Sequence, residues 1–179
     1  MKLPFNLDTV LARIEKAIAA YPKAAMFDLY ERGYNTLFEQ LISCIISVRT
    51  LDETTIPVSL KLFAQARTPE AMLLLSHENL VQLLMGSTFP GQKADTISGI
   101  SKIAVEQYNG NLPTTFEGLT ALKGVGPKCA NLALGVAAKL PGISVDKNSR
   151  IPNPSAGRSS GLCPPGWLPC TRLCIVITL

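Results

Sequence analysis

Two glycines separate two short helical segments in the run Leu119-Thr-Ala-Leu-Lys-Gly-Val-Gly-Pro-Lys-Cys-Ala130. Glycine permits positive φ angles and carries no side chain, so Gly124 and Gly126 allow the backbone to approach a ligand closely. Backbone N–H groups at the start of the second segment would then face that ligand, and the helix dipole favours an anion there. The chemistry that this arrangement predicts is sequence-independent binding of a nucleic-acid phosphate.

A Gly-Val-Gly turn by itself is equally typical of an ordinary helical hairpin, because short motifs recur by chance. The flanking residues make the pattern more specific, since apolar side chains recur at Leu119, Leu122, Val125 and Ala130. We therefore expect a helix-hairpin-helix at about residues 115–139, and the candidate DNA-binding residues in it are Lys123, Gly124, Val125 and Gly126.

This segment resembles the hairpin pattern L-x-x-L-P-G-V-G-x-K-x-A of the endonuclease III family of base-excision DNA glycosylases. In that family an apolar-Val-Asp sequence supplies a catalytic Asp eighteen residues after the hairpin lysine, and here Ile143-Ser-Val-Asp146 stands at that separation from Lys128. Residues 37–52 also resemble the central helix of the family and the turn that follows it. The resemblance covers roughly residues 8–146.

The resemblance implies a base-excision repair glycosylase with AP lyase activity, which excises oxidised bases, mainly pyrimidines, from double-stranded DNA. The partner would be a duplex with a damaged base or an abasic site, whose nucleotide is flipped out. Lys128 would attack C1′ and form a Schiff base that permits β-elimination. Asp146 would assist deprotonation or stabilise positive charge on the sugar. Without the motif, Lys128 is typical of a solvated residue and Asp146 of a helix cap.

The chain departs from the family pattern at two positions near the expected DNA surface. Arg49 stands where the family commonly has a Gln that fills the gap left by the flipped base. Arg49 would fill that gap or hold the orphan base, and a phosphate contact or a surface position is equally compatible with it. Lys123 replaces the family Pro, and either adds a phosphate contact or is simply solvated.

The composition changes after Asp146. Residues 147–179 contain five prolines, three of the five cysteines and no acidic residue, which predicts an irregular tail. Our hypothesis is a frameshift or aberrant gene end at this point, which the other reading frames of the nucleotide sequence would test. The second lobe would then be incomplete, and apolar residues of the first helix would be partly exposed, namely Leu11, Ile14 and Ile18.

The tail also bears on a cofactor, since the family often carries a [4Fe–4S] cluster on cysteines spaced C-x6-C-x2-C-x5-C. The tail has Cys163, Cys170 and Cys174, with a different second gap and no fourth thiolate. Because a cluster normally needs four thiolates, we expect no cluster, no other cofactor and no metal site. The two remaining cysteines, Cys44 and Cys129, lie in helical patterns and are interpreted as small buried apolar residues.

Charge gives weak support for nucleic acid as a partner. The net charge is +4, but residues 1–146 hold 13 basic and 13 acidic side chains, so the excess lies in the tail. A neutral body can still bind DNA through backbone amides and a few placed cations. No signal peptide or membrane span is recognisable, so we expect a cytoplasmic monomer, nucleoid-associated if bacterial.

Helical periodicity without strand alternation predicts an all-α protein. The resemblance adds a helix-hairpin-helix glycosylase fold, with a six-helix-barrel lobe largely present in residues 1–146 and an incomplete second lobe. We expect a first helix after Asp8, a buried central helix at residues 34–47, and a third helix that starts at a Thr50–Glu53 capping box. A fourth helix is expected after Thr68-Pro69, a fifth from Ser76 to Leu84 and a sixth at residues 92–108. A short helix should start at a Thr114–Glu117 capping box, and the last should span residues 128–139.

Two other functions stay open. A monofunctional adenine-excising glycosylase has no need of the Lys128 amine, so the presence of Lys128 argues against it. A non-catalytic helix-hairpin-helix DNA-binding module, or an inactive remnant, is favoured by the unusual tail. Salt-dependent DNA binding without base release would distinguish the latter.

Overall fold

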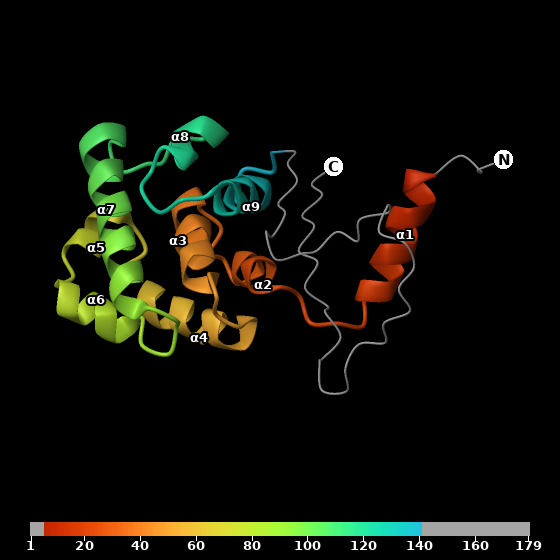
Figure 1. Ribbon diagram of the computed structural model, residues 1–179, viewed down its shortest axis with the longest axis horizontal. Helices are drawn as coiled ribbons and strands as arrows, with labels where there is room; N and C mark the ends of the chain where they lie inside the picture. The colour runs from red at the N-terminus through yellow and green to blue at the C-terminus, as the bar shows by residue number, and fades with distance from the viewer. Residues whose placement is uncertain (1–5, 141–179) are drawn as a thin grey trace, which may run out of the picture.

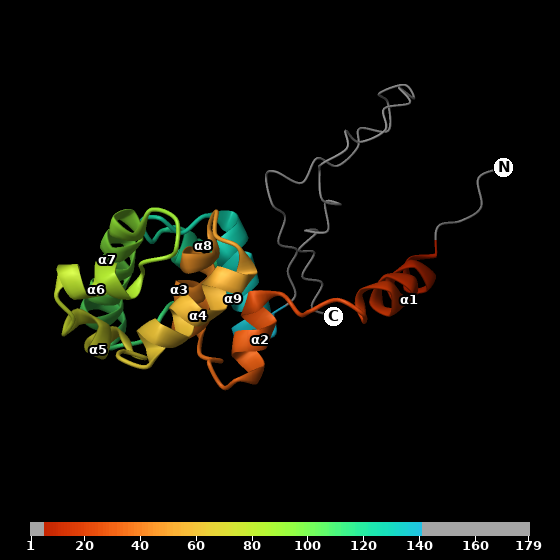
Figure 2. The same ribbon diagram turned by 90° about the horizontal axis from the view of Figure 1, so that it is seen from below.

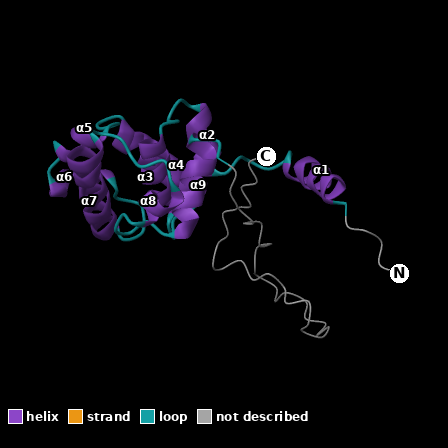
Figure 3. Cartoon of the chain, turned by 90° about the horizontal axis from the view of Figure 1, so that it is seen from above, coloured by secondary structure: helices purple, strands orange, loops and turns teal. Residues whose placement is uncertain are grey.

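The computed structural model describes residues 6–140, and within them helices joined by turns form the whole architecture, with no strand (Figure 3). In chain order these helices are α1 (Leu7–Ile18), α2 (Ala25–Glu31), α3 (Leu37–Ser47), α4 (Asp52–Phe63), α5 (Pro69–Leu73), α6 (His77–Leu83), α7 (Pro90–Tyr108), α8 (Phe116–Thr120) and α9 (Pro127–Ala137). The all-α prediction is confirmed. None of these helices has the length and apolar character that a bilayer span requires.

The central element is α3, which contacts α2, α4, α7 and α9 (Figure 1). All of its residues from Phe38 to Ile46 are buried. A helix that is apolar nearly all round must be enclosed by other elements, and this explains its central place. The buried amide of Gln40 donates hydrogen bonds to the carbonyl oxygens of Met26 (3.3 Å) and Tyr34 (2.7 Å), which ties the preceding loop to the helix.

Two groups of helices lie on either side of α3 (Figure 1). On one side α5 and α6 pack on α7, and on the other α8 packs on α9 (Figure 1). One continuous cluster of buried side chains joins both groups, from Met26 in α2 through α3 and α7 to Val136 in α9. Residues 25–137 therefore share a single hydrophobic core.

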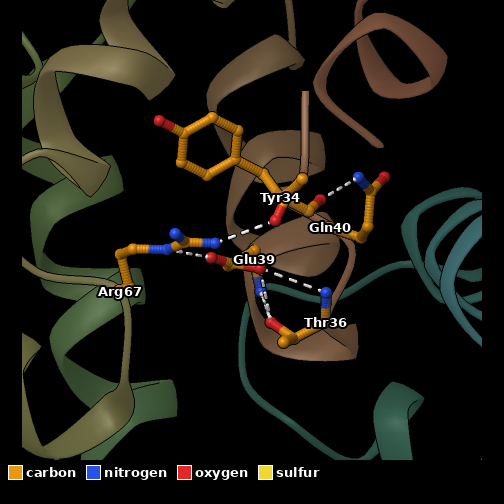
Figure 4. A network of polar contacts seen from close by, with 6 residues as sticks. Tyr34, Thr36, Glu39, Gln40 and Arg67 are labelled. Atoms are coloured by element: carbon orange, nitrogen blue, oxygen red, sulfur yellow. Dashed lines mark hydrogen bonds and ion pairs between the residues drawn. The ribbon is translucent and has the colours of Figure 1, made fainter. Parts of the chain in front are cut away.

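A polar network fixes the start of α3 (Figure 4). Thr36 and Glu39 form a capping box, and Glu39 is only 1% exposed. The Arg67 guanidinium donates to the Glu39 carboxylate at 2.7 Å and to the Gly33 carbonyl oxygen at 2.9 Å, and it lies 4.7 Å from the Tyr34 ring centroid. The hydrogen bond that Arg67 donates to Glu39 raises the pKa of Arg67. The buried carboxylate thus depends on Arg67 for its charged partner.

Replacing Arg67 with Met is expected to lower the free energy of unfolding by about 1–3 kcal/mol, because it leaves a buried carboxylate without its charged partner. Arg32 provides a matched control. Its side chain is 51% exposed against 52% for Arg67, but its partner Asp28 is 27% exposed, whereas Glu39 is only 1% exposed. Arg32→Met should change stability by about 0.5 kcal/mol or less. Urea denaturation measures both, and equal losses would contradict the assigned role of Arg67.

The structure corrects several predicted helix boundaries. Helix α2 was missed, and α7 begins at Pro90 rather than at residue 92. The Thr50–Glu53 capping box is wrong, because the N-cap of α4 is Leu51 and no side chain caps it. The Thr114–Glu117 box is also wrong, since Thr115 is the N-cap of α8 and its hydroxyl accepts from the Gly118 N–H. Asn6, not Asp8, caps α1. The caps predicted at Thr68 and Ser76 are confirmed.

Helix α1 stands apart from the other helices in two perpendicular views (Figures 1 and 2). Its sequence has an apolar stripe at helical spacing. Within that stripe Ile14 is 44% exposed and Ile18 is 58% exposed, so the predicted exposure of both side chains is confirmed.

Candidate nucleic-acid interface

The predicted hairpin is present between α8 and α9. Leu122 and Val125 are buried, and the Val125 N–H donates to the Leu122 carbonyl oxygen at 3.1 Å, which closes the turn. Gly126 is the N-cap of α9 and Pro127 follows at the first helical position, where its missing N–H matters least. No side chain caps this helix start. Its positive dipole end is therefore open to an anionic ligand such as a phosphate.

Gly124 is required at its position for two reasons. Its φ is +89°, which disfavours any residue with a Cβ. A Cβ added there would also lie 2.6 Å from Cγ2 and 3.2 Å from Oγ1 of Thr96, in α7. The hairpin turn is therefore in close contact with α7, and the glycine permits that contact.

Lys128 is the second residue of α9 and is half-buried, whereas Lys123 is exposed before the turn. The neighbouring Cys129 is buried and shares a hydrogen bond with Cys44 of α3. That hydrogen bond lowers the pKa of Cys129, and the positive charge of Lys128 lowers it further. The same hydrogen bond and burial together raise the pKa of Cys44. The base of the Lys128 side chain is thus fixed where α9 packs on α3, near the carboxyl end of α3.

Arg49 lies just beyond that end of α3, in the loop before α4, and is exposed. Its guanidinium carbon lies 5.9 Å from the ring centroid of Phe89, which comes from the loop before α7 and is 51% exposed. Both residues have left-handed backbone conformations, with φ of +57° and +54°. Each such conformation costs a non-glycine residue roughly 1–3 kcal/mol, so the surroundings must hold it. We refer to Arg49 and Phe89 together as the tip.

A buried polar network lies beneath the tip. The ammonium of Lys93, in α7, donates to the Ile46 carbonyl oxygen at 2.6 Å and to Thr50 Oγ1 at 2.9 Å. Thr50 and Thr88 share a hydroxyl–hydroxyl hydrogen bond of 2.8 Å, and the Thr88 hydroxyl donates to the Arg49 carbonyl oxygen at 2.6 Å. Burial lowers the pKa of Lys93 to about 8. Thr50 is thus part of this network rather than a helix cap.

Helix α7 connects the hairpin to the tip. Thr96 meets the turn at Gly124, while Lys93, one turn earlier in the same helix, binds the end of α3 below Arg49. The structure thereby places the hairpin, the base of Lys128 and the tip around the carboxyl end of α3. Asp146 lies outside the described residues, so its role stays a prediction.

Three residues of this region were not recognised from the sequence: Phe89, Thr88 and Lys93. The Phe89-Pro90 dipeptide carried a usable signal, because a large apolar residue directly before a helix-starting proline is a candidate loop residue. Nothing local marks Lys93 or Thr88, whose partners are 38 to 47 residues away in sequence.

A cluster or metal site was not expected. Within residues 6–140 no group of three or more His, Cys, Asp or Glu side chains is placed to hold a metal ion. Cys44 and Cys129 are buried, as predicted, and two thiols are fewer than the four that a [4Fe–4S] cluster needs. Cys163, Cys170 and Cys174 lie outside the described residues, so the prediction about the tail stays a prediction.

The fold and the site define a class of protein: an all-α protein whose glycine hairpin, lysine and exposed tip are suited to DNA. Residues 42–152 match the family described as HhH-GPD superfamily base excision DNA repair protein. The chain belongs to this family.

Within the family the chain is similar to endonuclease III. It is 44% identical over 117 residues to endonuclease III of Thermotoga maritima, which covers 65% of this chain and 55% of that protein. The chain thus spans about half the length of such relatives. The chain is also similar to the solved structure of a trapped endonuclease III–DNA covalent intermediate, with 27% sequence identity and a TM-score of 0.67. This structural match covers 79% of this chain and 63% of that chain. A 3-methyladenine DNA glycosylase of H. pylori shares the fold, with 19% identity and a TM-score of 0.63.

Proposed function

We propose that the chain is a base-excision DNA glycosylase with AP lyase activity, and that its substrates are oxidised bases, mainly pyrimidines, in duplex DNA. The observation that carries this proposal is the position of Lys128. It follows directly after the Gly124–Gly126 turn, at the start of α9, and its neighbour Cys129 is hydrogen-bonded to Cys44 of α3. An amine held beside an anchored backbone phosphate is suited to attack the adjacent sugar.

Each part of the candidate site has its own role in the proposed reaction. The hairpin binds a backbone phosphate through N–H groups at the start of α9. Phe89 enters the base stack and Arg49 occupies the space of the extruded nucleotide, as apolar wedges and cations do in other proteins that distort DNA. The Lys128 amine bonds to C1′ as the bond from C1′ to the damaged base breaks, and the base leaves with a proton. The C1′–O4′ bond of the sugar ring then breaks, a proton passes from the nitrogen to O4′, and the Schiff base forms. The Schiff base acidifies the C2′ proton, and loss of that proton breaks the C3′–O bond and releases the 3′-phosphate.

Asp146 is proposed to take a proton from the Lys128 ammonium or to stabilise positive charge on the sugar. The covalent intermediate named in the endonuclease III structure is that of a relative, and it supports the same covalent route here.

Incision of damaged DNA tests the proposal. The purified full chain is incubated with a 5′-labelled duplex that carries one thymine glycol, with an undamaged duplex as the control. Strand cleavage of the damaged duplex without alkali is the expected result. Base release that requires alkali for cleavage would contradict the lyase function, and absence of base release would contradict the glycosylase function.

A second function is favoured by one observation, namely the change in composition after Asp146, where residues 147–179 contain five prolines, three cysteines and no acidic residue. In this alternative the chain serves as a helix-hairpin-helix DNA-binding module without catalysis. This function predicts duplex binding that weakens with salt and is accompanied by no base release.

A further inference from the structure

Lys93 is the buried lysine among residues 6–140, with only 6% of its surface exposed, and no carboxylate in that range forms an ion pair with it. Its ammonium instead binds the Ile46 carbonyl oxygen at 2.6 Å. Ile46 is in the last turn of α3, where carbonyl groups have no partner within the helix. A cation there is favoured by the helix dipole. Lys93, from a different helix, thus caps the carboxyl end of α3.

From this cap a chain of hydrogen bonds leads outward to the tip. Thr50 Oγ1 accepts from Lys93 at 2.9 Å and from the Thr88 N–H at 3.2 Å. The Thr50 hydroxyl has two acceptors in reach, the Val48 carbonyl oxygen at 3.4 Å and Thr88 Oγ1 at 2.8 Å. Since the Thr88 hydroxyl donates to the Arg49 carbonyl oxygen, we assign the Thr50 proton to the shorter bond, with Thr50 as the donor. The side-chain donors therefore run in one direction, from the Lys93 ammonium through the Thr50 and Thr88 hydroxyls to the carbonyl oxygen of Arg49. Such directional chains strengthen each member.

We propose that Lys93 is the positioning residue of the tip: it holds Arg49 and Phe89 in the conformation that discriminates damaged from undamaged DNA. This inference rests on the proposed function. The network joins the two loops that carry the tip, because Thr50 follows Arg49 directly and Thr88 precedes Phe89 directly. It therefore fixes the backbone on both sides of the Arg49–Phe89 contact.

Stability alone does not account for a lysine at this position. Burial of an ammonium without a carboxylate partner is unfavourable, and the lowered pKa of Lys93, about 8, reflects that penalty. A methionine would occupy a similar volume without a charge. The lysine is instead suited to a local task, because it can donate to the Ile46 carbonyl and to Thr50 at the same time.

The test compares the binding of two duplexes that differ at one position, an uncleavable tetrahydrofuran abasic-site analogue or an ordinary nucleotide. The variants are Lys93→Met and Thr88→Val, each of which breaks the chain of hydrogen bonds. The matched control is Lys102→Met, on the same helix, since Lys102 is exposed and faces only Glu106. Melting temperature and circular dichroism of each full-length variant monitor folding.

The measured ratio is the affinity for the abasic-site duplex divided by the affinity for the ordinary duplex. We expect Lys93→Met and Thr88→Val each to reduce this ratio by about tenfold, roughly the effect of no longer holding one residue of the tip in its left-handed backbone conformation. Affinity for the undamaged duplex should change by less than about twofold, because the hairpin is intact. Lys102→Met should leave the ratio unchanged. In an Arg49→Ala, Phe89→Ala background, which lacks both side chains of the tip, Lys93→Met should cause little further loss, which a merely structural role would not produce.

An unchanged ratio in folded Lys93→Met, or in Thr88→Val if Lys93→Met does not fold, would overturn the inference. So would an equal loss of affinity for both duplexes. The proposed function fails separately, if the wild-type chain itself does not prefer the abasic-site duplex or does not release a damaged base.

Discussion

Replacement of Lys128 by Gln is expected to reduce strand incision at an abasic site by roughly 10³- to 10⁶-fold, the range over which loss of a covalent nucleophile acts in other enzymes. The reason is chemical: an amide nitrogen does not form a Schiff base with C1′, whereas a primary amine does. Gln retains a similar length and hydrogen-bonding capacity, so the packing of the half-buried side chain at the start of α9 changes little.

Borohydride trapping on abasic DNA measures the effect directly, because reduction of the Schiff base leaves a stable protein–DNA adduct. Wild type should give the adduct and Lys128→Gln should give none. Lys139→Gln is the control, since it removes one exposed positive charge just beyond the other end of α9. An adduct that persists in Lys128→Gln would show that another amine is the nucleophile.

Replacement of Gly124 by Ala is expected to lower the free energy of unfolding by about 1–3 kcal/mol and to weaken DNA binding by about tenfold or more. Two causes add. An Ala at φ +89° is strained, and its Cβ would lie 2.6 Å from Thr96 Cγ2, so the turn or α7 must move. A displaced turn no longer directs the N–H groups of α9 at one phosphate oxygen, and the binding loss follows from that.

A second substitution, this time in α7, separates the backbone strain from the collision with Thr96. Thr96→Ala in the Gly124→Ala background removes the collision but leaves the strained φ, so it should restore part of the lost stability. Gly99→Ala is the control in α7, because a Cβ added there would have no neighbouring atom within 4 Å. This substitution should leave the free energy of unfolding unchanged or raise it by up to about 1 kcal/mol. Urea denaturation and binding to abasic-site DNA provide the measurements. A Gly124→Ala variant that matches wild type in both would contradict the role assigned to this turn.

Local patterns were sufficient to predict the elements whose determinants are local. The buried α3 follows from its continuous apolar sequence, and the caps at Thr68 and Ser76 follow from side chains that bond three residues ahead. The hairpin follows from two glycines in an apolar frame. Helix α2 was missed because it is seven residues long and its N-cap, Ala24, has no side chain that could cap it. What holds it is burial of Ala25, Met26 and Leu29 against other helices, which no local pattern reveals.

In the candidate site, too, the residues with local determinants were predictable and those with distant partners were not. Lys128 and the hairpin were recognisable because they are contiguous in sequence. Arg49 was predicted as an isolated substitution, but its partner Phe89 comes from 40 residues further along the chain. Thr50 was assigned to a capping box because its spacing to Glu53 fits one, yet its hydroxyl is taken by Lys93 and Thr88. A long-range hydrogen bond outweighed a local one at that position.

The separation of α1 has a consequence for how the chain unfolds. An isolated helix of about this length is marginally stable in water, and melting α1 exposes little apolar surface that is not already exposed at Ile14 and Ile18. Its opening is therefore uncoupled from that of the common core, and the two behave as separate cooperative units. A single unfolding transition measured for this chain consequently reports on residues 25–137, and substitutions in α1 leave its midpoint in place.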